Sequence, residues 1–307
     1  MIVPYTGYQK HVAVIQQRAQ IGAAKLWYDT PHKTFYLLVS LELTSADPTP
    51  EMHTTVVGID VGVRYLAVSS EATGACSFHT GKRVLAKANH YARLRKRLQK
   101  KGTRAAIRRL VTVSGRERRL KADANHVVST RILEVHPSSF IGLEDLTHIR
   151  TRTRRRTYQR KKEGSGVKRV SVKQRKANAG YARWFFAELQ SMIAYKALLR
   201  GSMAVKVDAH YTSQACPRCG FTDAANRPRK GLLFVCQQCH YTLHADLVGA
   251  RNLVMRTLLI RQDWMSTGCL SISPDVSSVE IKAARLSRYA ELRWSLDTSP
   301  VSLDRGY

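Results

Sequence analysis

Four cysteines in two identical pairs are the feature that most constrains this chain. Cys216 and Cys219 form the first Cys-x2-Cys pair, and Cys236 and Cys239 form the second pair after a spacer of sixteen residues. Each pair can form a tight knuckle that presents two thiolates to one metal, and two facing knuckles complete the tetrahedral site that zinc favours. Four protein ligands leave no open position, so the spacing predicts a ribbon that holds one structural zinc ion.

The same segment also admits other chemistry. Two disulfides or a redox pair would use the same four cysteines, and His240 or His244 could replace one of them as a zinc ligand. The N-terminus lacks the basic and then apolar layout of a signal peptide, and no run approaches the ~18 apolar residues that span a bilayer. We therefore expect reduced thiols, a cytoplasmic location and no membrane partner.

The positive charge of the chain is concentrated in two basic stretches. Lys and Arg number 51 against 22 Asp and Glu, which gives a formal net charge of +29. Residues 82–121 hold sixteen Lys or Arg against one acid, and residues 150–176 hold thirteen against one. A run of charge is often a solvated face, but this concentration repels itself unless a polyanion neutralises it, so we expect nucleic acid as the partner. The residues expected to contact its backbone are Arg93, Arg95, Lys96, Arg97, Lys100, Lys101, Arg154, Arg155, Arg156, Arg160 and Lys161.

Short runs rich in β-branched and aromatic residues predict strands. These runs lie at 34–43, twice within 54–70, and at 76–80, 140–143 and 205–207. The three consecutive strands between residues 54 and 80 indicate an antiparallel meander near the start of a domain.

Apolar residues at helical spacing predict four helices. They lie at 84–110, 116–135 and 180–200, and from Asp246 to about residue 259. Within 180–200 the residues expected to face the core are Phe186, Leu189, Ile193 and Ala197. The basic segment 150–176 lacks periodicity and is expected to be a mobile loop, and residues 265–307 are rich in serine and weakly patterned.

Three acidic residues stand where predicted strands or helices begin or end. Asp60 lies between glycines in an apolar strand run, Glu144 follows the apolar run 140–143, and Asp246 opens the last helix. Each also has a structural interpretation, because backbone donors can satisfy Asp60 and the other two can cap helices. If the three converge at the ends of a sheet, they form a site for Mg²⁺, which relieves their repulsion, activates water and stabilises a leaving oxygen.

These motifs, in this order, resemble the TnpB (OrfB) family of insertion-sequence proteins. The matching segments read GIDVGVRYLAV, FIGLEDL, and YTSQACPRCG followed by VCQQCHYTLHADLVGARNL. The segment RWFFAELQSMIAYKA at 183–197 also resembles the family's helix before the ribbon. The resemblance covers roughly residues 25–260. Members of this family are RuvC-like nucleases related to the type V CRISPR effectors.

The resemblance implies a fold class, an activity and partners. The fold is expected to be α/β: an RNase H/RuvC-like nuclease domain with an inserted four-cysteine zinc ribbon and a short β-rich N-terminal remnant. Matched motif by motif, the family's three catalytic acids fall on Asp60, Glu144 and Asp246, which would hold two Mg²⁺ ions. The implied activity is a transposon-associated, RNA-guided DNA endonuclease of a prokaryote that acts by the two-metal route. Its partners would be a DNA target and a guide RNA from the transposon end, and its charge would associate it with the nucleoid.

The expected domain order follows the motifs. It is a remnant of an N-terminal wedge-like barrel at 1–52, the first part of the nuclease core at 53–210, the zinc ribbon at 211–243, the last nuclease motif and its helix at 244–262, and a tail at 263–307. Two departures from the family pattern stand out. Val248 and Gly249 replace the Asn and first Ala of the third acidic motif, and the helical lobe that usually precedes the nuclease domain is missing.

Two other functions fit part of the pattern. A nucleic-acid-binding protein that does not cut, such as a guided repressor or a degenerate transposase remnant, fits the missing front lobe but not the intact set of acids. A ribosome-type zinc-ribbon protein fits the charge but leaves the three acids as a coincidence.

Overall fold

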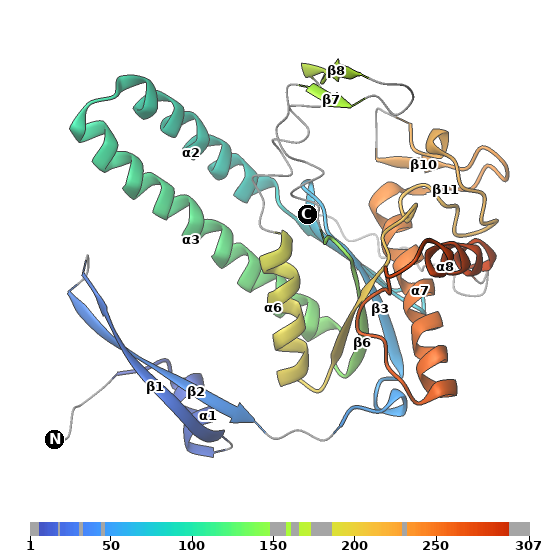
Figure 1. The fold of residues 1–307 in the computed structure, drawn as a ribbon, viewed down its shortest axis with the longest axis horizontal. Helices are drawn as coiled ribbons and strands as arrows, with labels where there is room; N and C mark the ends of the chain where they lie inside the picture. The colour runs from blue at the N-terminus through green and yellow to red at the C-terminus, as the bar shows by residue number, and fades with distance from the viewer. Residues whose placement is uncertain are drawn as a thin grey trace. The chain divides into compact units, whose positions relative to one another are not determined.

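The computed structural model describes eight stretches of the chain and divides it into two compact units. The described residues are 6–17, 19–30, 33–43, 47–147, 158–160, 166–172, 186–228 and 232–294. The first unit is Met1–Thr49 and the second is Pro50–Tyr307. Figure 1 draws both units, with the first in blue at the N-terminal end of the colour bar.

In the described part of the first unit there are one helix and a two-stranded antiparallel hairpin. The helix is α1 (Gln9–Gln17), and the strands are β1 (Ala19–Asp29) and β2 (Thr34–Leu43). The strand expected at 34–43 is confirmed, whereas α1 and β1 were not predicted from sequence. Two aromatic pairs join the strands near the turn: the ring centroids of Trp27 and Tyr36 lie 5.4 Å apart, and those of Tyr28 and Phe35 lie 4.6 Å apart. Such cross-strand pairs stabilise a hairpin and fix its register.

A five-stranded mixed sheet forms the centre of the second unit. Its strand order is β5-β4-β3-β6-β9, and the bounds are β3 Thr55–Asp60, β4 Tyr65–Glu71, β5 Cys76–Thr80, β6 Ser139–Glu144 and β9 Met203–Val207. β3, β4 and β5 are antiparallel neighbours, so the expected meander is confirmed. β6 and β9 instead run parallel to β3, which requires helical crossovers between them. The fold is therefore mixed α/β, as expected.

Helices cover both faces of this sheet. Odd-numbered and even-numbered residues of a strand point to opposite faces, so each set packs against different helices. Val57 and Ile59 pack with α3 (Arg104–Val135) and α6 (Phe186–Leu199), whereas Val56 packs with α7 (Ala245–Thr267). Successive residues of a strand point to opposite faces, so the even-numbered residues of β3 and β6 face α7. The four residues of α6 that were expected to face the core, Phe186, Leu189, Ile193 and Ala197, are all buried.

The two basic helices differ from the expected boundaries. α2 spans Lys82–Lys101 and α3 begins at Arg104, so one helix does not run through 84–110. Gly102 takes the left-handed conformation, with φ 66°, that ends a helix, and the Thr103 hydroxyl accepts a hydrogen bond from the Ala106 amide to start the next one. α3 then continues across residues 111–115, where a break between helices was expected.

The C-terminal part of the chain is more ordered than its pattern indicated. α7 extends to Thr267, and a further helix, α8, spans Val279–Glu291. The Arg285 guanidinium contacts the Asp208 carboxylate at 2.9 Å, and the Lys206 amide donates to the Ile272 carbonyl at 2.8 Å. The segment that is weakly patterned in sequence therefore contains a helix and specific contacts up to residue 294.

The segment expected to be a mobile loop contains a short hairpin. Its strands are β7 (Tyr158–Arg160) and β8 (Val167–Arg169), which pair antiparallel. The remainder of 150–165 and residues 173–176 lie outside the described residues. Among the helices that the structure describes, none has the length and apolar character needed to cross a membrane.

Candidate metal sites

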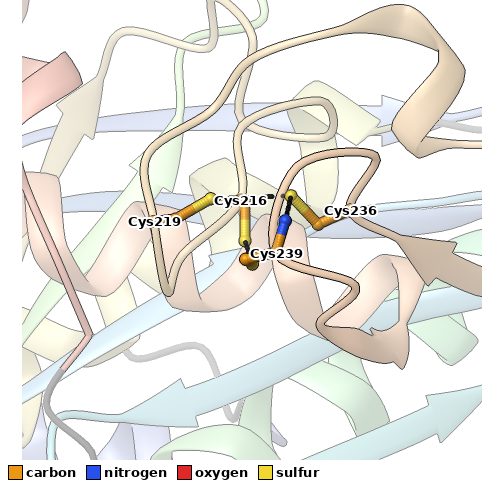
Figure 2. A group of neighbouring side chains, drawn as sticks. All are labelled: Cys216, Cys219, Cys236 and Cys239. Atoms are coloured by element: carbon orange, nitrogen blue, oxygen red, sulfur yellow. Dashed lines mark hydrogen bonds between the residues drawn. The ribbon is translucent and has the colours of Figure 1, made fainter.

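The four paired cysteines converge on one point in the ribbon. Their Sγ atoms all lie within 4.8 Å of one another, with 3.7 Å between Cys216 and Cys239 and 3.5 Å between Cys219 and Cys236 (Figure 2). Tetrahedral coordination at a Zn–S distance of about 2.3 Å requires sulfur atoms about 3.8 Å apart. The arrangement therefore fits one zinc ion. All four are free thiols, and neither His240 nor His244 belongs to the group.

Two equivalent knuckles present these thiols. In the first, the Gly220 amide donates to the Cys216 carbonyl at 2.8 Å, and in the second the His240 amide donates to the Cys236 carbonyl at 3.1 Å. Both turns need a left-handed residue after the second cysteine, with φ 78° at Gly220 and 56° at His240. A histidine in this conformation is strained, whereas glycine is not. His240 therefore contributes to the knuckle through its backbone conformation and its amide hydrogen bond.

The ribbon leads directly into α7. Its strands are β10 (Leu233–Val235) and β11 (Thr242–His244), and the second strand ends where the helix begins. His244 is the N-cap, since its Nδ1 accepts a hydrogen bond from the Asp246 amide at 3.3 Å. Burial lowers the pKa of His244, so its ring is neutral, as this acceptor role requires.

The surroundings of Cys216 and Cys236 shift the pKa values of their thiols in opposite directions. Burial raises the pKa of Cys216. For Cys236, burial also acts to raise the pKa, but the backbone amides of Cys239 and Gln238, together with hydrogen bonds from the Cys219 and Cys239 thiols, outweigh it and lower the pKa to about 7. Amide donors that stabilise a thiolate favour the form that binds metal.

The carboxyl edge of the sheet brings the three candidate acids to one region. Asp60 ends β3 and Glu144 ends β6, and the parallel pairing of Ile59 with Leu143 places the two acids side by side. Asp60 and Glu144 both have even residue numbers, so both side chains lie on the face of the sheet that α7 covers. Asp246 lies in the first turn of α7, which packs on β3.

Asp60 and Asp246 are close enough to repel each other. Burial and the Asp246 carboxylate raise the pKa of Asp60 to about 7, against the lowering effect of Arg227. Gly249 makes room for this approach, because a Cβ atom at that position would lie 3.0 Å from the Asp60 Cγ. Glycine at this position, where the family pattern has Ala, therefore leaves the space beside Asp60 open.

Arg227 is a member of this site that the sequence did not reveal. Its Nη2 lies 3.1 Å from the Asp246 Oδ1, and its side chain is 42% exposed. The preceding residue, Asn226, is fully buried and bonds the Gln214 and Phe221 carbonyls, which anchors the segment within the ribbon. The ribbon thus brings a cation to the acids. Arg227 lies nineteen residues before Asp246 in an unpatterned segment, so only the folded structure shows their contact.

The acids are less tightly grouped than the thiols. Among the described residues, the four cysteines are the only group of three or more potential ligands whose donor atoms all lie within 4.8 Å of one another. Asp60, Glu144 and Asp246 share the edge of the sheet without meeting that distance. Carboxylate oxygens are the ligands that Mg²⁺ takes, often with several waters that fill wider gaps between them.

The expected nucleic-acid contacts lie in part on α2. Arg93, Lys96, Arg97, Lys100 and Lys101 are exposed and recur at the spacing of one helical face. Arg95 differs, because its guanidinium contacts the buried Glu117 carboxylate at 2.9 Å, where Lys121 also binds at 2.8 Å. The four residues Arg154, Arg155, Arg156 and Lys161 lie outside the described residues, and Arg160 is described only as part of β7.

Known proteins match this chain along most of its length. Residues 38–150 match the family described as a probable transposase, OrfB of IS605, and residues 186–253 match the Cas12f1-like TNB domain. The putative RNA-guided DNA endonuclease InsQ of Escherichia coli is 30% identical over 267 residues, which cover 81% of this chain and 57% of InsQ. Cas12f1 of Sulfoacidibacillus thermotolerans is 40% identical over 72 residues, which cover 24% of this chain and 17% of that protein.

A solved structure shares the fold. It is the Cas12f1 chain of a cryo-EM Cas12f1–sgRNA–target DNA complex, with a TM-score of 0.50 at 19% identity over 77% of this chain and 64% of the other. The chain thus has a mixed α/β fold like that of this Cas12f1 chain, together with a four-cysteine cluster. Its matched segments are similar to the TnpB (OrfB) family. It spans less than two thirds of the length of these relatives.

Proposed function

We propose that this protein is a transposon-associated, RNA-guided DNA endonuclease that hydrolyses phosphodiesters with Mg²⁺ at Asp60, Glu144 and Asp246. The observation that carries the proposal is the pairing of Asp60 with Asp246 at the carboxyl edge of the sheet, beside Glu144. A carboxyl group whose pKa is raised to about 7 by burial and a like charge is unfavourable as an isolated anion. A divalent cation bound between such groups removes the repulsion.

The topology of the sheet supports a RuvC-like nuclease domain. An antiparallel meander followed by two parallel strands, in the order β5-β4-β3-β6-β9, is the arrangement that the family resemblance implies. In it Asp60 leaves the central strand β3, Glu144 leaves its neighbour β6, and Asp246 arrives on the helix that crosses both.

Each acid would then have a defined role. Asp60, the most central, would bridge the two ions, and Glu144 and Asp246 would complete the ligand sets. Bound Mg²⁺ would activate water and stabilise the leaving oxygen. Arg227 is partly exposed beside Asp246, where its guanidinium can contact a phosphate oxygen.

The ribbon and the basic helices would supply the remaining functions. One structural zinc at the four cysteines would fix the segment that holds Arg227 and the start of α7. The exposed cations of α2 have no acidic partner within 82–121, since Glu117 is already bound by Arg95 and Lys121. They are free to contact the backbones of a guide RNA and a DNA target. The names of InsQ and Cas12f1 support this choice of partners.

The test is a cleavage assay with matched variants. Asp60→Asn and Glu144→Gln each remove a negative charge from the site with little change in shape, and each should abolish Mg²⁺-dependent cleavage. Asp145→Asn is the control, because the Asp145 carboxylate bonds the neighbouring Thr147 amide at 3.0 Å and takes no part in the site. It should cut at the wild-type rate.

The binding data decide between the two leading functions. All three variants should bind nucleic acid with affinity close to that of the wild type, because none removes a phosphate contact. If the wild type binds a matched target and does not cut it with Mg²⁺, the protein is a non-cutting binder and the proposed function is wrong.

A further inference from the structure

Arg251 is a buried cation that has no anionic partner among the residues that the structure describes. It lies on α7, five residues after Asp246, and its side chain is 1% exposed. One nitrogen, Nη1, donates to the Tyr241 hydroxyl at 2.6 Å. The other two, Nε and Nη2, have no hydrogen-bond partner among the residues that the structure describes, and no described carboxylate forms an ion pair with them. A guanidinium keeps its charge when buried, so such a site is costly unless negative charge lies nearby.

The surroundings of Arg251 belong to the four-cysteine ribbon. Tyr241 lies in the second knuckle, where its carbonyl accepts the Cys236 amide at 2.9 Å. On the other side, the Trp294 ring lies 4.9 Å from the guanidinium carbon, and the Trp294 amide donates to the Pro217 carbonyl of the first knuckle at 2.7 Å. Arg251 therefore lies between Tyr241 and Trp294, each of which is hydrogen-bonded to one of the two knuckles.

Packing places the thiols close to the same point. Val248, one turn before Arg251 on α7, packs in one apolar cluster with Cys216 and Cys236. Tyr241, whose hydroxyl accepts the hydrogen bond from Arg251, packs against this cluster together with Cys219 and Cys239. The residue that Arg251 binds therefore lies against the four cysteines.

A zinc centre would supply the missing negative charge. Four thiolates around one Zn²⁺ carry two net negative charges, and two of the four cysteines, Cys216 and Cys236, are buried away from the solvent that could balance this charge. We propose that Arg251 is the charge counterpart of the zinc–thiolate centre and that it couples zinc binding to the placement of α7. This inference rests on the zinc site of the proposed function, but it does not depend on nuclease activity.

The coupling has a direction that can be measured. With zinc bound, the positive charge of Arg251 stabilises the thiolates and so raises zinc affinity. Without zinc, the same charge is buried among neutral groups and destabilises the ribbon. Because α7 carries both Arg251 and Asp246, loss of zinc would disturb the acidic site as well.

The experiment measures the zinc affinity of the 307-residue chain by competition with a chromogenic chelator of known affinity. Arg251→Met keeps the length and apolar packing of the side chain but removes its charge, and we expect at least a tenfold loss of affinity, in the range typical of residues that support metal ligands. Arg256→Met is the matched control. Arg256 lies on the same helix and is 4% exposed, but its guanidinium bonds the Asp208 and His210 carbonyls, away from the ribbon, so its loss should leave zinc affinity within twofold.

A second pair of variants and a second readout keep the test decisive. Arg251→Lys retains the charge and Arg251→Gln does not, so the lysine variant should bind zinc several-fold more tightly than the glutamine variant. In thermal unfolding, Arg251→Met should lower the midpoint of the zinc-loaded protein and leave unchanged or raise that of the zinc-stripped protein. An equal loss in both forms, or a zinc affinity within twofold of a wild type that binds one zinc, overturns the inference. A wild type that binds no zinc overturns the proposed zinc site itself.

Discussion

Substitution of Gly58 by alanine should separate α7 from the sheet. Gly58 lies in the middle of β3, and a Cβ atom there would overlap the Ala250 carbonyl oxygen and the Val254 amide nitrogen of α7. It would also lie 2.9 Å from the Leu253 carbonyl carbon. These are backbone atoms that cannot rotate away, so relief requires movement of the helix that carries Asp246.

The expected loss of stability follows from two opposing effects. An extra methyl group in a packed core costs about 1–3 kcal/mol, and contact with backbone places this site at the upper end. Replacing glycine within a strand recovers about 0.5–1 kcal/mol of conformational entropy. The free energy of unfolding should therefore fall by about 2 kcal/mol, and the cleavage rate should fall because Asp246 moves relative to Asp60.

The assay is urea unfolding followed by tryptophan fluorescence, to which Trp264 on α7 contributes from a buried position. Gly115→Ala is the control, since Gly115 lies within α3 and the nearest atom to an added Cβ is the Arg119 Nη1 at 3.9 Å. This variant should gain about 0.5–1 kcal/mol from helix propensity. If Gly58→Ala is as stable as the wild type, the close approach of α7 to β3 does not exist in solution.

Four further outcomes follow from the same structure. His240→Gly should raise the free energy of unfolding by about 1 kcal/mol, because glycine removes the left-handed strain at φ 56°; a loss in urea unfolding would show that the histidine side chain has a role of its own. Burial, followed by the charges of Arg131 and His136, lowers the pKa of His79 from 6.5 to about 4, so the unfolded chain binds one more proton between these pH values and stability should fall as pH falls from 6.5 to 4. His79→Gln should flatten that slope by up to about 1.4 kcal/mol per pH unit in pH-dependent unfolding, and an unchanged slope contradicts the assignment. Elemental analysis should find one zinc per wild-type chain; Cys219→Ser should remove this zinc and lower the unfolding temperature, whereas the same change at the exposed Cys269 should alter neither. Nucleic-acid affinity should fall roughly 10³–10⁵-fold between 50 and 200 mM salt if 6–10 phosphates are neutralised, and a flat profile would identify the basic faces as merely solvated.

The central sheet and the ribbon could be anticipated because their signals are local. The apolar runs within 54–60 and 139–144 predict strands, and the Cys-x2-Cys spacing predicts the knuckles. The sequence also contains signals for the break between α2 and α3, since Gly102 is typical of a helix end and Thr103 of a helix start. The basic residues continue on both sides of these two positions, which obscured the signals.

Other parts depend on contacts between distant segments. α8 has no buried residue, and contacts with distant segments hold it in place, among them the ion pairs of Arg285 with Asp208 and of Arg288 with Asp263. Arg227 reaches Asp246 only through the path of the ribbon. Contacts that form only in the tertiary structure leave no characteristic residue spacing in the sequence.

The most direct test of the account is to locate a divalent cation by anomalous diffraction from crystals soaked in Mn²⁺, which takes the same oxygen ligands as Mg²⁺. The account predicts a manganese peak bonded to the carboxylates of Asp60 and Asp246 in the wild type, and its loss in crystals of Asp60→Asn. The zinc peak expected at the four cysteines is the internal control for data quality. Zinc at the ribbon with no manganese at Asp60 in the wild type would contradict the assignment of the three acids as a catalytic metal site.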